Sequence, residues 1–279
     1  MTSRARLVEP SALPAFGPAI GVTLTFVGFL ILLPLSALAL RPWEGGLDHI
    51  WKIVSDPRTL AALRVSFSAA LIAACFNAVF GTIVAWTLVR YDFPGRRIFD
   101  AFVDLPFALP TAVAGIALAA IYSPKGTIGG WLAQHDITVA YTPLGIMIAL
   151  IFVGFPFVVR SIEPVLADFE AEIEEAAATL GASRLRTVFH VIAPAILPAI
   201  LSGFSLALAR AIGEYGSVIF IAGNVPFVSE IAPLLIVIRL EEYDYSGAAA
   251  IGLVMLTISF ALLFGLNAAQ SHLFRRGQR

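Results

Sequence analysis

Apolar residues in this chain are gathered into six long runs, separated by shorter polar stretches. Each run has 24 to 30 residues, and about 20 predominantly apolar residues are enough for a helix to cross the hydrocarbon core of a bilayer. The pattern predicts an all-α, polytopic membrane protein with six transmembrane helices. The predicted spans are residues 17–40, 60–89, 98–122, 142–166, 195–222 and 247–271.

The polar stretches between the spans differ in character. Residues 41–59 and 123–141 are expected to be loops, and residues 90–97 form a short basic connection with a Phe-Pro-Gly turn. Residues 224–245 are acidic overall and contain the apolar run 231–238, which is too short to cross a membrane. We expect this last piece to be an interfacial or re-entrant segment.

Composition supports a membrane protein and excludes several other classes. Of the 279 residues, 59% are hydrophobic and only 13% are charged, whereas soluble domains carry about a quarter charged residues. A net charge of −1 argues against a nucleic-acid partner. The single cysteine, Cys75, gives neither a disulfide framework nor a thiol metal site, so no metal is expected. The chain has no GxxxxGK[ST] run to hold ATP phosphates, so it is not expected to be an enzyme.

The third predicted span contains two prolines one turn apart, Pro106 and Pro110, followed by Thr111. Prolines at this spacing remove two backbone donors, and two outcomes stay open. Neighbouring helices can tolerate a simple bend. Alternatively, the helix is broken, and its freed backbone groups together with the Thr111 hydroxyl line a translocation pathway. Asp100 and Asp104 lie in the first turns of the same span, where we expect them to make capping and assembly contacts.

The polar run 168–194 is the longest interruption between apolar spans. Apolar residues recur in it at helical spacing on either side of Gly181, which stands where a helix C′ residue would be. The pattern predicts a helix, a glycine turn and a second helix, each with an apolar stripe. Such stripes fit a groove on another protein. The alternative is an amphipathic helix that lies on the membrane surface. The periodic positions are Phe169, Ile173, Ala176, Ala177, Leu180, Leu185, Val188, Phe189 and Ile192.

The same run resembles the EAA loop of ABC-importer permeases, whose signature is EAA-x3-G-x9-I-x-L-P. Val191 and Ala193 replace the isoleucine and the leucine of that signature. The resemblance implies a type I permease whose loop, residues 167–194, forms a cytoplasmic coupling helix that docks into an ATP-binding subunit dimer. The residues that match the signature are Glu175, Ala176, Ala177, Gly181 and Pro194.

Three further runs are similar to the sulfate/thiosulfate importer permeases, in particular their T-type subunit. These runs are DLPFALPTAVAG at 104–115, GFPFVVR at 154–160 and RAIGEYGSVIFIAGN at 210–224. The resemblance implies an importer built with a related W-type permease, two ATP-binding subunits and a periplasmic sulfate-binding protein. This chain would bind no cofactor itself, and ATP with Mg²⁺ would be bound and hydrolysed by the partner ATPase. Molybdate permeases share this architecture, so molybdate or another oxyanion is the alternative substrate.

Basic residues predict the orientation. Eleven of the 18 lysines and arginines fall in the lead, the 90–97 connection, the end of the fourth span with the polar run, and the tail. The positive-inside rule therefore places both termini and the polar run in the cytoplasm, where ATP is available. The expected organisation in the inner membrane is a cytoplasmic lead at 1–16, a six-helix permease domain at 17–272 surrounded by lipid, and a cytoplasmic basic tail at 273–279.

Arg210 is the candidate substrate residue. It lies well inside an apolar span, where a guanidinium costs about 2.5–3.5 kcal/mol on insertion scales and needs a partner or a water-filled path. Glu214 follows one turn later. Arg210 either faces a pathway for sulfate or forms an internal ion pair with Glu214, and both stay open. Gly213 and Gly216 favour close helix packing.

Two other classes of membrane protein are weaker alternatives. A secondary anion transporter would be expected to carry inverted repeats with half-helices in matched positions, and only one proline-broken span is present. A structural scaffold would need neither Arg210 nor the paired prolines. The permease of an ATP-driven importer accounts for all of these features.

Overall fold

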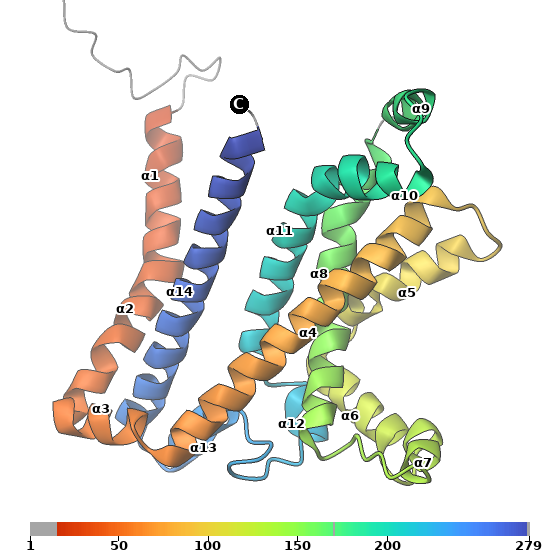
Figure 1. Ribbon diagram of the computed structural model, residues 1–279. Coiled ribbons are helices and arrows are strands. Elements are labelled where there is room, and N and C mark those ends of the chain that lie inside the picture. The colour runs from red at the N-terminus through yellow and green to blue at the C-terminus, as the bar shows by residue number, and fades with distance from the viewer. Residues whose placement is uncertain (1–15, 170, 278–279) are drawn as a thin grey trace, which may run out of the picture.

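The computed structural model describes residues 16–169 and 171–277, and every regular element within these ranges is a helix (Figure 1). The first half comprises α1 (Phe16–Val27), a π-helical turn (Gly28–Leu32), α2 (Leu33–Leu40), a 3₁₀ turn (Arg41–Gly45), α3 (Leu47–Val54), α4 (Pro57–Arg90), α5 (Arg96–Ala108), α6 (Thr111–Tyr122) and α7 (Thr127–Ala133). The second half comprises α8 (Pro143–Ala167), α9 (Ala171–Thr179), α10 (Arg184–Thr187), a π-helical turn (Val188–Ile192), α11 (Ala193–Ile212), α12 (Val218–Ile221), α13 (Ala232–Glu241) and α14 (Tyr245–Gly277).

Within residues 16–169 and 171–277, five helical stretches are long and apolar enough to cross a membrane, and the bent pair α5–α6 would make a sixth. The all-α prediction and the number of apolar spans are therefore confirmed. The two predicted loops, 41–59 and 123–141, are wrong as loops because they contain α3 and α7. The 224–245 segment contains α13, whose 10 residues are about 15 Å long, too short to span.

The core of the molecule is the packing of α4, α8 and α11 against one another. Val158 of α8 is fully buried between two glycines, Gly81 of α4 and Gly203 of α11. A Cβ atom on Gly81 would lie 2.8 Å from Val158 Cγ1, and one on Gly203 would lie 2.8 Å from Val158 Cα. Small residues at these positions let the helix backbones approach closely, which is how helices associate where hydrophobic burial gives little driving force.

The third predicted span is broken, which is one of the two outcomes that its prolines left open. It is not one helix, because α5 and α6 meet at an angle of 115°. Pro106 is accommodated inside α5, and the break falls at Leu109 and Pro110. Leu109 is extended, with φ −86° and ψ 133°, as expected for a residue that precedes proline. Pro110 then stands at the N-cap of α6.

The fifth predicted span needs a correction, since it begins and ends earlier than residues 195–222. Helical structure is continuous from Arg184 to Ile212, and it turns around the π segment before Pro194 (Figure 1). The helix then ends at the cap residue Gly213, and the remaining residues form a turn and the short α12. The sequence pattern missed this end because apolar residues resume directly after the turn, at 218–222.

The end of the molecule with α3, α12 and α13 is tied together by polar contacts. Arg58 of α4 donates two hydrogen bonds to the buried Glu230, from Nε at 2.8 Å and from Nη2 at 2.6 Å. Asp244, just before α14, accepts from Gly247 N–H at 2.9 Å and contacts His49 of α3 at 3.3 Å. Burial acts to raise the pKa of the Asp244 carboxyl, but these hydrogen bonds outweigh it and the pKa is lowered.

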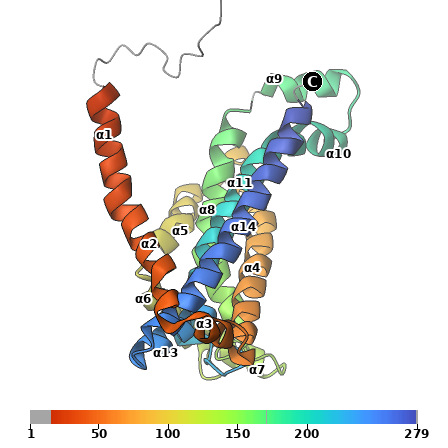
Figure 2. The same ribbon diagram turned by 90° about the vertical axis from the view of Figure 1, so that its left-hand side faces the viewer.

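The start of α1, the α9–α10 segment and the end of α14 all lie at the opposite end of the molecule, with the start of α1 well separated from α9 and α10 (Figures 1 and 2). The predicted lead at 1–16 falls almost entirely outside the described residues. Part of the predicted tail at 273–279 is a direct continuation of α14, which runs to Gly277.

Candidate functional site

The glycine turn of the EAA loop has the backbone that the sequence predicts. Gly181 has φ +80°, in the left-handed region that favours glycine. The N–H of Ala182 donates to the carbonyl of Ala177 at 3.0 Å, and the N–H of Gly181 donates to that of Ala178 at 2.9 Å. This is the Schellman arrangement, which satisfies the last carbonyls of α9. Ser183 then begins α10 as its N-cap, accepting from the N–H of Arg186 at 3.4 Å.

One ion pair ties α9 to the bundle. Arg90, the last residue of α4, contacts Glu174 at 2.6 Å. The Arg90 guanidinium also lies over the rings of Trp86 and Phe169, at 5.5 and 5.8 Å from their centroids. An arginine held by both a carboxylate and two aromatic faces has a defined orientation. The loop is therefore positioned by the end of α4 and not only by its own turn.

The same loop leaves large apolar side chains uncovered. Leu180, beside the glycine turn, is 88% exposed, and Glu175 and Ala176 are exposed on the same helix. In contrast, Val188 is partly buried and Ile192 fully so, because they pack against the bundle. The predicted second stripe is therefore split: Leu185 and Phe189 are exposed, and Val188 and Ile192 contact the bundle. We call the exposed set the coupling surface; it consists of Ile173, Leu180, Leu185 and Phe189.

Pro194, the last residue of the signature, explains the shape of the helix that follows. The π-helical turn Val188–Ile192 lies directly before it, as the π turn Gly28–Leu32 lies before Pro34. A proline has no N–H to donate and its ring clashes with the carbonyl four residues earlier, so the wider turn accommodates both problems. Pro194 therefore joins the loop to α11 without ending the helix.

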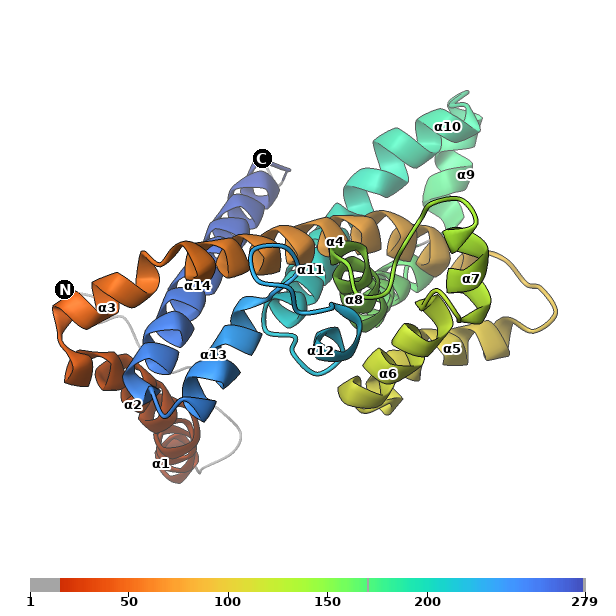
Figure 3. The ribbon, with the colours of Figure 1, turned by 90° about the horizontal axis from the view of Figure 1, so that it is seen from below.

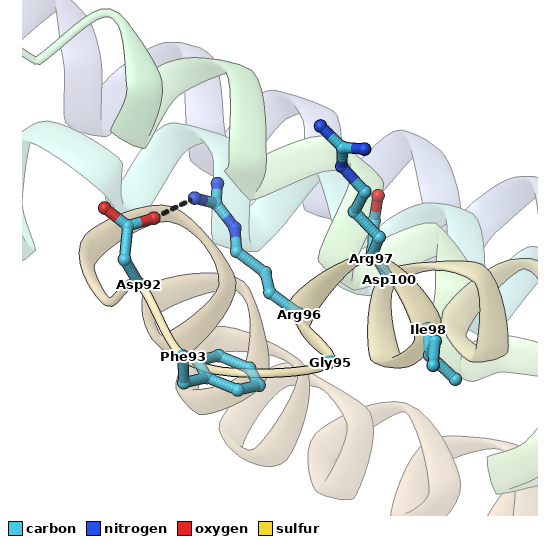
Figure 4. Close-up of a pocket in the computed structure, with 7 residues that line it drawn as sticks. All are labelled: Asp92, Phe93, Gly95, Arg96, Arg97, Ile98 and Asp100. Carbon is cyan, nitrogen blue, oxygen red and sulfur yellow. Dashed lines mark hydrogen bonds and ion pairs between the residues drawn. The ribbon is translucent and has the colours of Figure 1, made fainter.

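A cavity of about 680 Å³ lies at the turn between α4 and α5 (Figure 4). Its rim holds the ion pair between Arg96 and Asp92, at 2.8 Å, with Arg97 and Asp100 on the first turns of α5. Because Arg90 connects the end of α4 to α9, this polar hollow lies at the same end of the molecule as the coupling surface (Figure 1). The side chains that line it carry charges of both signs, so we interpret it as a solvated recess and not as a site for one charged ligand.

Arg210 and Glu214 form the predicted ion pair, at 2.5 Å. Their environments are unequal, because the side chain of Glu214 is 2% exposed and that of Arg210 is 35% exposed. Glu214 is not on the same helix as Arg210, which ends at Ile212, but in the turn that follows. Its Oε1 atom accepts from the N–H of Ser217 at 2.8 Å and from the Ser217 hydroxyl at 3.0 Å. The carboxylate thus holds both the arginine and the start of α12.

The start of α6 lies directly on this turn. A Cβ atom on Gly216 would collide with Thr111 Oγ1, and one on Gly115 would collide with the carbonyl oxygen of Ser217 and lie 2.8 Å from its Cα. We call this contact the α6 crossing; it consists of Thr111 and Gly115 with Gly216 and Ser217. The structure therefore brings Pro110 and Thr111 next to the Arg210–Glu214 turn, which the sequence had given as separate candidates. Pro106 stays inside α5, away from the break.

Arg160 of α8 is a further charged residue whose contacts sequence reasoning did not foresee. It donates to both Asp100 and Asp104 of α5, at 2.7 Å from Nη1 and 2.6 Å from Nη2, and also to Glu163 of its own helix. Asp100 and Asp104 were expected to make capping and assembly contacts. The structure shows no side-chain capping bond at the start of α5, where Gly95 is the N-cap, and both carboxylates instead pair with Arg160 of α8. The available signal was the presence of four charges in two apolar spans, since such charges need partners.

The two groups of predicted residues are far apart but connected. The coupling surface lies at one end of the molecule and the α6 crossing near the other (Figure 1). The helical stretch from Arg184 to Ile212 runs from the first to Arg210 without interruption. Chemically, the first region presents exposed apolar side chains, and the second presents the buried Glu214 carboxylate with the partly open Arg210 guanidinium.

Comparisons with known proteins agree with this geometry. Residues 77–278 match the family described as binding-protein-dependent transport system inner membrane component. The chain is 51% identical over 250 residues to the probable sulfate transport system permease protein cysT of Nephroselmis olivacea, covering 90% of this chain and 88% of that one. It is 47% identical over 264 residues to the sulfate transport system permease protein CysT of Escherichia coli strain K12, covering 95% of both.

Solved structures show the same fold at low sequence identity. A bacterial ABC transporter that imports the acidic polysaccharide alginate superposes with a TM-score of 0.77 at 14% identity, covering 91% of this chain and 94% of that one. The family match, the near full-length relatives and the shared fold lead to one conclusion. This chain belongs to the inner membrane components of binding-protein-dependent transport systems, and it has the fold of ABC importer permeases.

Proposed function

We propose that this chain is the membrane-spanning permease subunit of an ATP-driven importer for sulfate and thiosulfate. The substrate is assigned from the 47–51% identity to permeases named for sulfate transport, which extends over 90–95% of the chain. Molybdate or another oxyanion is the alternative cargo, because the fold alone does not distinguish these anions.

The coupling surface supports the ATP-driven part of the proposal. Four large apolar side chains exposed on a positioned loop fit a groove on a partner protein. We assign this partner as a dimer of ATP-binding subunits, which bind ATP and Mg²⁺ and perform the hydrolysis. The remaining partners would be a related W-type permease and a periplasmic sulfate-binding protein. This chain would bind no cofactor and catalyse no reaction.

The continuous helix from Arg184 to Ile212 supplies the mechanical connection. A displacement of α10 by the ATPase would be carried through the π turn into α11, at whose far end Arg210 lies. The buried Glu214 would then determine how far Arg210 extends, because the same carboxylate is held by Ser217. A single cation moderated by a carboxylate can pass a dianion without trapping it, whereas an unpaired cation in a low-dielectric span would bind it tightly.

Uptake of radiolabelled sulfate in vesicles that contain the complete transporter tests the proposal. We expect ATP-dependent uptake that thiosulfate inhibits and that collapse of the ion gradients leaves unchanged. Molybdate competing more strongly than thiosulfate would assign the alternative cargo. Uptake that stops when the ion gradients collapse, with ATP present and no copurifying ATPase, would assign a secondary anion transporter instead.

The orientation is part of the proposal, with both termini and the coupling surface in the cytoplasm. Cysteine labelling in a Cys75→Ser background tests it. Lys125 and Arg184 are suitable positions because both side chains are exposed at opposite ends of the molecule, whereas Gly126 is unsuitable because a Cβ there would collide with the carbonyl oxygen of Ala120. We expect Lys125→Cys to be labelled in intact cells and Arg184→Cys only after permeabilisation; the reverse pattern contradicts the orientation.

A further inference from the structure

An apolar groove of about 590 Å³ lies where α2, α13 and α14 meet, well away from the coupling surface and the α6 crossing (Figures 1 and 3). Its hollow exists because small residues occupy its floor, namely Ala37 of α2 with Ala248, Ala249 and Gly252 of α14. Its volume is within the range of about 300–1,000 Å³ that is typical of small-ligand sites.

Gly252 is the lining residue of α14 that lies farthest along the helix from Tyr245, and α2 approaches α14 closely there. A Cβ atom on Gly252 would lie 3.3 Å from Leu38 Cδ1. Gly252 follows Tyr245 by seven residues, a rise of about 10 Å along α14. This depth is less than half of the roughly 30 Å hydrocarbon core. The groove therefore extends from the membrane interface partway into a single leaflet.

The mouth of the groove is polar. Arg41 and Tyr245 line it, and the guanidinium carbon of Arg41 is 5.8 Å from the centre of the Tyr245 ring. Arg41 also pairs with Glu44 at 3.1 Å, but both side chains are more than half exposed, so this pair is weak. A guanidinium has five N–H donors, and one carboxylate leaves most of them available. Tyrosine beside arginine at this depth is typical of a membrane interface.

We propose that this groove binds a phospholipid, with one acyl chain along Ala248, Ala249 and Gly252 and the phosphate on Arg41. The apolar floor favours an apolar occupant, and the cation at the mouth favours an anion; a phospholipid supplies both in one molecule. Arginine can give two parallel hydrogen bonds to phosphate oxygens. A transmembrane helix of the second permease is the competing occupant, and it would fill the groove without a phosphate. The lipid site depends on neither the substrate nor the ATPase.

Native mass spectrometry of the complete purified transporter tests the site, with palmitoyl-oleoyl phosphatidylglycerol as the probe. Diacylglycerol with the same chains is the second probe, because it lacks the phosphate. We expect Arg41→Gln to weaken phosphatidylglycerol binding at least fivefold and to leave diacylglycerol binding unchanged. Ala249→Leu, which fills the floor, should weaken both probes to a similar degree.

Two matched control variants keep the test specific. Lys125→Gln removes an exposed cation elsewhere at the same end of the molecule, and Ala261→Leu enlarges an exposed alanine farther along α14. Both should bind phosphatidylglycerol as the unmodified transporter does. Unchanged binding in Arg41→Gln and Ala249→Leu would overturn the proposal. So would an Ala249→Leu variant that loses the second permease while its lipid binding is unaffected, since the groove would then be a subunit interface.

Discussion

The coupling surface and the α6 crossing are the two functional regions of this molecule, and they are built in opposite ways. At the coupling surface, Leu180 and its neighbours are exposed on a loop that one ion pair positions. At the crossing, the backbone of Gly115 lies so close to Ser217 that no further carbon atom fits. The first region depends on a partner to cover it, and the second depends on space that the chain itself fills. Substitutions should therefore act on docking at the first and on folding at the second.

The largest expected effect is that of Gly115→Ala at the crossing. One added carbon would overlap the Ser217 carbonyl oxygen, and backbone cannot move aside as a flexible side chain can. Overpacking of this kind typically costs about 1–3 kcal/mol and occasionally more. We expect the variant to lose sulfate uptake completely and to unfold at a lower temperature in detergent. Gly213→Ala is the matched control, since a Cβ atom there meets nothing within 4 Å. Equal behaviour of the two variants would contradict the packing argument.

The next largest effect is expected for Gly181→Val at the coupling surface. A Cβ atom at Gly181 also meets nothing within 4 Å, so the cost is conformational and not steric crowding by neighbours. At φ +80° an L-residue pays about 1–2 kcal/mol, and a β-branched residue pays at the upper end. This is about thirtyfold in the population of the docking conformation. We expect coupled uptake to fall by that order while membrane insertion and thermal stability are retained. Gly181→Asn should be nearly normal, and a normal Gly181→Val would contradict the assignment of the loop.

A smaller effect, about tenfold, is expected for Arg210→Ala, which lies beside the crossing but is partly open. Loss of the cation should raise the barrier to anion passage by about 1.4 kcal/mol. Basal ATPase activity and assembly should be preserved, and Arg210→Lys should keep more uptake because it retains the charge. The contrary outcome is that Arg210→Ala prevents assembly and Arg210→Ala with Glu214→Gln restores it. The pair would then be structural, and the pathway would have to be sought from Pro106 to Thr111.

These two regions also differ in how far the sequence predicts them. The local pattern predicts the Gly181 turn and its left-handed backbone, because both depend on periodicity and on a single special residue. It predicts the apolar stripes but not which of their residues are exposed, since Val188 and Ile192 pack against the bundle. The crossing joins Thr111 to Gly216 across more than a hundred residues, and no local pattern records such a contact. The same limit applies to Arg160, whose partners Asp100 and Asp104 lie 60 and 56 residues away.

The sequence also predicts the ends of the membrane helices poorly, for a related reason. Apolar residues resume at 218–222, so the predicted fifth span runs on through residues 213–217. In the structure the buried Glu214 accepts a hydrogen bond from the N–H of Ser217, in a turn that ends the helix. The paired prolines indicated a disturbance at the α5–α6 break, although the sequence did not decide between a bend and a break. It did not give the 115° angle, because that angle depends on where α6 can pack against the turn at Gly216.

The smallest effect is expected within the coupling surface itself, from Glu175→Ala. Glu175 is exposed and makes no ion pair within the described residues, so its charge can act only on a docked partner. Exposed charges of this kind contribute about 0.2–1 kcal/mol, which is at most about fivefold in affinity. Its neighbour Glu174 is the internal comparison, since it is half-buried and pairs with Arg90 at 2.6 Å.

Titration of the purified permease with the ATP-binding subunit at low and high salt separates the two. Glu175→Ala should weaken binding slightly, only at low salt, and leave thermal stability unchanged, because surface charges are screened. Glu174→Ala should weaken binding at both salt concentrations, because it releases α9 from the end of α4. If the two substitutions have the same salt dependence, the ion pair with Arg90 does not position the loop, and the coupling surface is held by its glycine turn alone.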